Sequence, residues 1–240
     1  MAKSQRRKID LLGDTVEYDV RRSADATKPR IDVDIHGVTV VLPETEATSP
    51  TKILQENAAW VIEKKRKYDT YREQIPERSF DKGAVFPYLG EPHEIVVERR
   101  PSSSVVDDTF RLAEHHVEET SVKRALETLY RRKARERFER RADHFAATMN
   151  VDYEQIEIRN QRTKWGSCSS TGTLGLNWRL MMAPPDVLDY VVIHELAHLR
   201  EPNHTDAFWS LVAEHDPDYE GHAQWLDEHS VQLIFSEDDL

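Results

Sequence analysis

One apolar segment, residues 184–199, constrains the fold more than any other part of the chain. Pro184 and Pro185 can begin a helix there, because a proline in the first turn gives up no needed N–H group. One helical stripe then holds Val187, Val191, His194 and His198, and apolar neighbours widen it at Leu188, Val192, Leu196 and Leu199. Burying imidazoles without partners is costly. The segment therefore predicts a buried helix whose histidines have a function or bonding partners. We expect this helix to end near Arg200, because Pro202 disfavours helical geometry in the residue before it.

Within that helix the chain reads His194-Glu195-Leu196-Ala197-His198, the pattern H-E-x-x-H. Residues four apart lie on one helix face, so both imidazoles can reach a single point. Zinc accepts neutral imidazole nitrogens and, in catalytic sites, takes three protein ligands and keeps one position open. Glu195 lies beside the histidines, where its carboxylate can take a proton from water. The motif predicts a catalytic zinc site.

A site of this kind needs a third protein ligand, and His204 is the first candidate. It follows His198 by six residues. Metzincins share that spacing, but here Glu201 replaces their glycine, and no methionine follows His198 to form their Met-turn. The six-residue spacing therefore supports His204 as the third ligand, but the chain is not assigned to the metzincins. His222 and Glu214 stay alternative ligands, since some zincins take the third ligand from a later helix.

Several blocks stand in a fixed order between residues 165 and 209. They are Trp165-Gly166-Ser167-Cys168, Leu176-Asn177-Trp178-Arg179-Leu180, residues 183–192, residues 194–199, Asn203-His204-Thr205 and Phe208-Trp209. In this order they resemble the YgjP-like metallopeptidase domain, a relative of the SprT and WLM zincins. The resemblance implies a zinc-dependent, protease-like fold with His194, His198 and His204 as ligands and Glu195 as base. The expected activity is hydrolysis of peptide bonds in a peptide or protein substrate.

The composition favours a cytoplasmic protein with no membrane segment. No apolar run reaches membrane-spanning length, and the first eight residues lead into no signal-like segment. The single cysteine, Cys168, excludes an internal disulfide and fits a reducing compartment. A net charge of −11 opposes general attraction to nucleic acid or acidic membranes, and it is compatible with a high-salt source.

The pattern of elements predicts an α+β fold without an internal repeat. Expected strands cover residues 16–20, 31–35, 38–42, 94–98, 153–159 and 173–180. Expected helices cover residues 50–73 and 121–149, followed by three C-terminal helices. We expect a β-rich N-terminal region at 1–100 and a zincin-like metallopeptidase core at 101–240, packed as one unit.

The strand over residues 173–180 is a candidate for pairing with substrate. In zincins an edge strand beside the active-site helix pairs with an extended peptide substrate. Gly175 permits close backbone approach, while Asn177 and Arg179 can present polar groups, so these three are candidate substrate-binding residues. A core strand that only supports the helix is the alternative.

Trp165-Gly166-Ser167-Cys168 is interpreted as a structural turn, and Cys168 as a small buried residue rather than a nucleophile.

The long helix carries eight basic residues between 124 and 141: Arg124, Arg131, Arg132, Lys133, Arg135, Arg137, Arg140 and Arg141. Only Glu127, Glu136 and Glu139 oppose them within the helix. A solvated helix with acidic neighbours elsewhere in the fold is the favoured interpretation. Phosphate contacts are the alternative, as in a DNA-associated protease of SprT type or a zinc-bearing protein or nucleic-acid adaptor. For an enzyme, Tyr190 and Tyr219 are candidates to stabilise the oxyanion.

Overall fold

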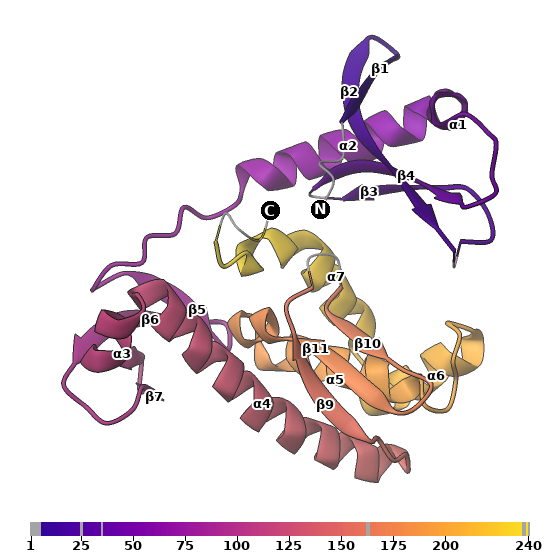
Figure 1. The fold of residues 1–240 in the computed structure, drawn as a ribbon. Helices are drawn as coiled ribbons and strands as arrows, with labels where there is room; N and C mark the ends of the chain where they lie inside the picture. Colours follow the sequence, from indigo (N-terminus) through magenta and orange to yellow (C-terminus); the bar gives the residue numbers. More distant parts are fainter. Residues whose placement is uncertain (1–5, 25, 35, 162–163, 237–238, 240) are drawn as a thin grey trace. The chain divides into compact units, whose positions relative to one another are not determined.

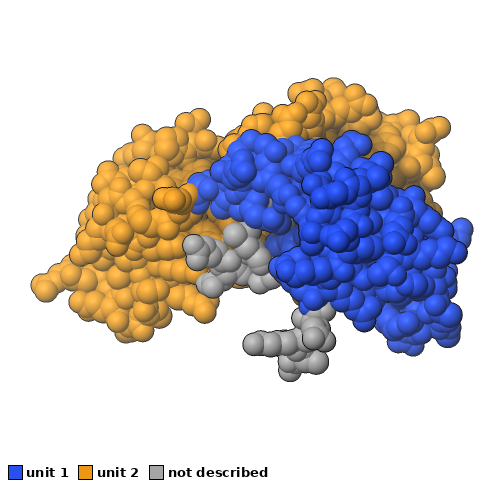
Figure 2. All heavy atoms as spheres, turned by 90° about the horizontal axis from the view of Figure 1, so that it is seen from above, with its two compact units in different colours: residues 1–76, 240 blue, residues 77–239 orange. Residues whose placement is uncertain are grey.

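The computed structural model describes residues 6–24, 26–34, 36–161, 164–236 and 239. Contacts between Cα atoms divide the chain into two compact units, one ending at Pro76 and one beginning at Glu77 (Figures 1 and 2). Each unit combines helices with β-sheets, which confirms the predicted mixed α+β architecture. The expected division into a β-rich region at 1–100 and a metallopeptidase core at 101–240 stays a prediction. No helix in the described residues is both long and apolar enough to cross a bilayer.

The first unit is a four-stranded sheet covered by helices. Its elements are β1 (Arg7–Leu11), β2 (Asp14–Ser23), β3 (Arg30–Asp34), β4 (Gly37–Pro43), α1 (Pro50–Glu56) and α2 (Ala58–Glu73). The strand order is β1-β2-β4-β3, with the central pair parallel and the outer pairs antiparallel. Ile35, expected in a strand, lies outside the described residues. The single helix expected at 50–73 is interrupted because the Asn57 side-chain amide donates to the Ile53 carbonyl at 2.8 Å.

The second unit begins with another four-stranded sheet. Its elements are β5 (Val85–Tyr88), β6 (Glu91–Glu98), β7 (Ser104–Val106), β8 (Thr109–Ala113), α3 (Glu114–Glu119) and α4 (Val122–Met149). The order is β5-β6-β8-β7, again with a parallel central pair and antiparallel outer pairs. The long helix expected at 121–149 is confirmed, and the Ser121 hydroxyl caps it by accepting from the Arg124 N–H at 3.2 Å.

These two sheets repeat one another, so the expectation of no internal repeat is wrong. In each sheet the first hairpin turns through a leucine and a glycine with positive φ, at Leu12 (51°) and Gly13 (94°) and at Leu89 (52°) and Gly90 (86°). After each sheet, one helix has a serine N-cap and a fully buried leucine five residues later, namely α1 with Ser49 and Leu54 and α4 with Ser121 and Leu126. In the second unit the short helix α3, with Ala113 as its N-cap, comes before α4. The repeat is not visible as sequence identity, because the two sheets share their strand pairing and pattern of buried positions but not their side chains.

The two leucine-glycine turns differ in what they contact. Leu89 donates its N–H to the Met181 carbonyl at 2.7 Å, and a Cβ built on Gly90 would lie 3.2 Å from the Cα of Pro184. Leu12 is 75% exposed, and a Cβ on Gly13 would meet nothing within 4 Å. The second turn is therefore packed against the residues that precede the H-E-x-x-H helix.

The remainder of the second unit holds a three-stranded sheet and the C-terminal helices. These elements are β9 (Gln155–Arg159), β10 (Gly166–Cys168), β11 (Thr173–Asn177), a 3₁₀ turn (Trp178–Met182), α5 (Pro185–Ala197), α6 (Asp206–His215), α7 (Tyr219–His229) and a 3₁₀ turn (Ser230–Leu233). The strand order is β10-β11-β9 (Figure 1). The strand expected at 173–180 is thus central, with partners on both sides, and its predicted edge position is wrong. The structural turn expected at 165–168 is also wrong, because Gly166–Cys168 form an outer strand of the sheet.

Helix α4 supports α5 through a pair of charge-assisted hydrogen bonds. The Arg141 guanidinium donates to both carboxylate oxygens of Asp189, at 2.7 and 2.8 Å. Both side chains are largely buried, with exposed fractions of 26% and 14%. Such bidentate pairs fix orientation as well as adding stability.

Replacing Asp189 by asparagine is expected to lower the free energy of unfolding by about 1–3 kcal/mol, because Arg141 loses its charged partner in a partly buried place. Urea titration measures the change. Glu139→Gln is the matched control, since Glu139 pairs with Arg135 at 3.4 Å where both side chains are about half exposed. There we expect a loss below about 1 kcal/mol. Equal losses in both variants would contradict a special role for the Arg141–Asp189 pair.

Candidate metal centre

Helix α5 presents the H-E-x-x-H motif at its C-terminal end. The helix begins at Pro185 and ends at Ala197, with His198 as its C-cap, three residues before the expected end at Arg200. It ends early because the N–H groups of Leu199 and Arg200 bond to carbonyls three residues back, at 3.0 and 3.1 Å. This tightening turns the chain towards His204.

Three histidines converge at this end of α5. One ring nitrogen from each of His194, His198 and His204 lies within 4.8 Å of the others. The Nε2 atoms of His194 and His204 are 3.0 Å apart. A tetrahedral ion with nitrogens at about 2.0–2.1 Å requires nitrogen separations of roughly 3.3 Å, so the three side chains fit one ion after small adjustments.

The protonation state of the cluster also fits a metal. Burial, aided by the nearby His198 and His204, lowers the pKa of His194 to about 4, which leaves its imidazole neutral. Burial lowers the pKa of His198 as well. The Nδ1 of His198 lies 3.3 Å from the Glu201 carbonyl. A proton held on Nδ1 by that carbonyl leaves Nε2 as the coordinating atom.

The alternative third ligands are placed elsewhere. His222, on α7, has its Nδ1 2.9 Å from the Asp216 carboxylate, and Glu214 is an exposed residue of α6. In the part of the chain that the structure describes, His194, His198 and His204 form the one group of three potential ligands that converge. The geometry therefore favours His204 over His222 and Glu214.

Glu195 is buried beside the histidines, with only 6% of its surface exposed. Burial raises the pKa of its carboxyl to about 7, while the nearby Lys164 ammonium lowers it. The backbone of β10 passes directly over this side chain. A Cβ built on Gly166 would lie 2.6 Å from Cγ and 2.7 Å from Cδ of Glu195, and closer still to Oε1. Gly166 thus leaves the space that the Glu195 carboxylate occupies, a role that sequence reasoning missed.

Substituting Gly166 by alanine is expected to reduce peptide cleavage by at least about tenfold, because the new methyl group must displace Glu195 from beside the histidines. Metal content should stay unchanged, since no histidine is touched. Gly221→Ala on α7 is the matched control, because the atoms nearest to its Cβ would be those of the flexible, exposed carboxylate of Asp218. Full activity in Gly166→Ala would show that this close approach has no bearing on the site.

The three residues expected to bind substrate lie in a buried part of the sheet. Gly175 and Asn177 belong to the central strand β11, and Arg179 to the turn after it. The Asn177 amide donates to the carbonyls of residues 161 and 164, at 2.7 and 3.2 Å. Arg179 is 4% exposed and pairs with Asp239. Substrate binding by these residues stays a prediction, although their polar side chains already have partners within the chain.

Of the two outer strands of this sheet, β10 is the one that carries Gly166 beside Glu195. The Trp165 carbonyl accepts from the Asn177 N–H at 2.9 Å, and the Ser169 N–H donates towards β11 at 3.0 Å. In an antiparallel ladder such residues alternate with residues whose N–H and C=O point away. Gly166 and Cys168 therefore direct their backbone groups outwards, and no described strand pairs with that edge.

A pocket of about 320 Å³ opens beside Glu195. Its lining residues are Lys164, Trp165, Gly166, Tyr190, Val191, His194, Glu195, Ala223 and Leu226. Burial, with smaller effects from Asp216, Glu195 and Tyr219, raises the pKa of Tyr190 to about 12, so its hydroxyl stays a donor. The Tyr219 hydroxyl instead donates to Glu220 at 3.2 Å. Of the two candidates for stabilising an oxyanion, Tyr190 is the one that lines this pocket.

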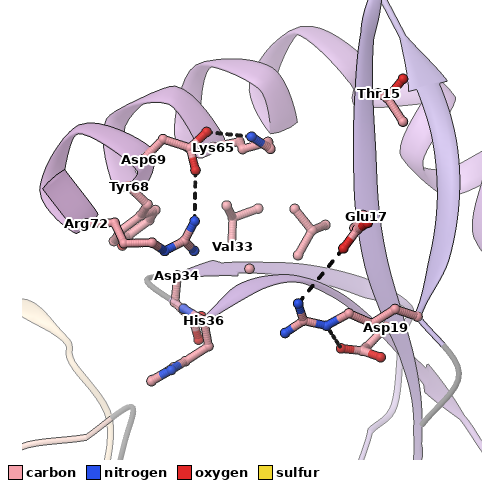
Figure 3. Close-up of a pocket in the computed structure, with 13 residues that line it drawn as sticks. Thr15, Glu17, Asp19, Val33, Asp34, His36, Lys65, Tyr68, Asp69 and Arg72 are labelled. Carbon is pink, nitrogen blue, oxygen red and sulfur yellow. Dashed lines mark hydrogen bonds and ion pairs between the residues drawn. The ribbon is translucent and has the colours of Figure 1, made fainter. Parts of the chain in front are cut away.

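A larger pocket, of about 520 Å³, lies in the first unit (Figure 3). Its charged side chains pair with one another. Asp69 lies 2.5 Å from Lys65 and 3.1 Å from Arg72, and Arg6 lies 3.7 Å from Asp19. With cations and carboxylates already matched, this pocket indicates no particular class of ligand.

Five of the eight basic residues between 124 and 141 form ion pairs within the described part of the fold. The pairs on the helix itself are Arg124–Glu127, Arg131–Glu127, Lys133–Glu136 and Arg135–Glu139. Arg141 pairs with Asp189 of α5. This arrangement favours the solvated helix face over a phosphate-binding surface.

The Cys168 thiol has a pKa raised to about 11, mainly by burial and further by Glu195, which leaves it protonated at neutral pH.

Comparison with known proteins gives the family. The model of the YgjP-like metallopeptidase domain matches residues 27–229, and the chain belongs to this family of metallopeptidases. Two solved structures are similar over part of the chain, and both are metallopeptidase zymogens. Abylysin of Pyrococcus abyssi is 20% identical with a TM-score of 0.36, covering 40% of this chain and 99% of its own. Jannalysin of Methanocaldococcus jannaschii is 21% identical with a TM-score of 0.35, covering 38% and 94%. No curated protein matches the chain.

Proposed function

We propose that this protein is a zinc metallopeptidase whose second unit is a zincin-like core. His194, His198 and His204 would hold the ion, and Glu195 would act as general base. One observation carries the proposal, namely that the imidazoles of His194, His198 and His204 converge beside the buried Glu195 carboxylate. Membership of a metallopeptidase family supports it.

In this mechanism the chain's residues position the reactants and move one proton. A bound zinc ion supplies Lewis acidity, which polarises a carbonyl and lowers the pKa of water. The Glu195 carboxylate accepts a proton from the attacking water and transfers it to the leaving amine nitrogen. Tyr190 donates a hydrogen bond to the oxygen of the scissile carbonyl as negative charge develops on it.

The substrate would bind as an extended strand along β10. Gly166 and Cys168 supply outward-facing N–H and C=O groups, and Gly166 lies against Glu195. Main-chain pairing of this kind gives affinity without demanding a particular sequence. Replacing the paired amide of a cleaved peptide by its N-methyl form is expected to reduce kcat/KM by at least about tenfold. Equal rates for both peptides would remove β10 as the docking strand.

A metal analysis combined with a peptide-library digest tests the function. The purified protein is expected to contain about one zinc per chain and to cleave peptides. A chelator should abolish cleavage, and added zinc should restore it. A metal-free protein, or cleavage that a chelator leaves unchanged, would overturn the proposal.

A zinc-bearing protein or nucleic-acid adaptor is the second candidate. Burial of the Glu195 carboxylate beside the histidines favours the enzyme, since metal binding alone does not need it. The internal ion pairs of α4 likewise weigh against a DNA-associated role. We also propose a cytoplasmic location, in keeping with the lone thiol of Cys168.

A further inference from the structure

The pocket beside Glu195 has an apolar interior. Val191 and Tyr190 of α5 are buried at 4% and 8% exposure, and Leu226 of α7 at 7%. Ala223 lines the pocket from the same face of α7, three residues before Leu226. The small Ala223 side chain contributes to leaving this space open.

The direction of β10 connects this pocket to a bound strand. Gly166 lines the pocket, and the Cα–Cβ direction of residue 166 points at Glu195. When one strand pairs with another, side chains of directly opposed residues lie on the same face of the sheet. A substrate residue opposite Gly166 would therefore project its side chain towards α5 and the pocket.

We propose that this pocket selects a large apolar side chain, such as leucine or phenylalanine, in the substrate residue opposite Gly166. The proposal rests on the proposed peptidase function. A volume of about 320 Å³ accommodates one such side chain, and buried apolar groups from α5 and α7 surround it.

The decisive variant is Ala223→Phe, which fills the pocket from α7. The measurement is the ratio of kcat/KM between two peptides that differ at one residue next to the scissile bond. This is the residue that lies opposite Gly166, and it is phenylalanine in one peptide and glycine in the other. The parent should prefer phenylalanine by at least about tenfold, and the variant should lose that preference while still cleaving the glycine peptide. Ala223→Val is a smaller step that should shift the ratio in the same direction.

Ala147→Phe is the matched control, because Ala147 is an exposed residue of α4 outside the pocket. The ratio of kcat/KM between the phenylalanine and glycine peptides should be the same in this variant as in the parent. An unchanged ratio in both Ala223 variants would overturn the proposal, as would a parent preference for charged side chains.

A binding measurement separates this inference from the proposed function. Titration with N-acetyl-phenylalaninamide should shift the NMR methyl signals of Val191 and Leu226, whereas N-acetyl-glycinamide should not. Binding of the first probe by a protein that cleaves no peptide would overturn the peptidase function and support the pocket. Absence of binding to either probe would overturn the pocket even in an active enzyme.

Discussion

Glu195→Gln is expected to lower peptide cleavage by at least about a hundredfold while leaving the metal content near one ion per chain. Glutamine has a similar volume and leaves His194, His198 and His204 in place, so folding and coordination should persist. The amide cannot accept the proton that a general base must take from water. Turnover on a library-derived peptide and metal content by mass spectrometry measure the two effects separately.

Glu214→Gln is the control for this variant, because Glu214 is an exposed glutamate of α6 that lies away from the histidine cluster. Its activity should equal that of the parent. If Glu195→Gln were to cleave as fast as the parent, the proposed base would be wrong. Loss of metal in the same variant would instead indicate that the Glu195 carboxylate is a ligand of the metal.

His204→Ala is expected to abolish tight metal binding, and with it cleavage, since two protein ligands rarely retain a catalytic zinc. The imidazole nitrogen of His204 lies 3.0 Å from that of His194, so its removal opens one side of the cluster. The measurements are metal content after dialysis and turnover with zinc added back. Excess zinc should restore only part of the activity.

His222→Ala is the matched control, because His222 bonds to Asp216 and has no part in the cluster. It should keep its metal and most of its activity. The opposite result, with full metal in His204→Ala and loss in His222→Ala, would move the third ligand to α7.

The histidine cluster was open to prediction because most of its signals are local. His194 and His198 are four residues apart on one helix, and His204 follows after a short turn, so spacing alone brings them near one another. The α4 helix was equally accessible, since its serine N-cap is readable from sequence. The family resemblance, which the match over residues 27–229 confirms, rests on the same stretch of chain.

The free edge of the sheet was not open to prediction in this way, because strand pairing joins residues far apart in sequence. Leu174, Gly175, Leu176 and Asn177 are all buried in the structure, as in a central strand, but in the sequence the two leucines alternate with a glycine and an asparagine and so form no continuous apolar run. The role of Gly166 leaves no local trace, since the carboxylate that fills its side-chain space belongs to residue 195.

The two repeated hairpins have different tolerance to insertion. The turn at Leu89 and Gly90 is bonded to Met181 and packed on Pro184, so a peptide tag inserted there would disturb the start of α5. The matching turn at Leu12 and Gly13 has the same backbone shape but an exposed leucine and open space around its glycine. For protein engineering, the first copy is thus the permissive position for a label or affinity tag, and the second copy marks the position to leave intact.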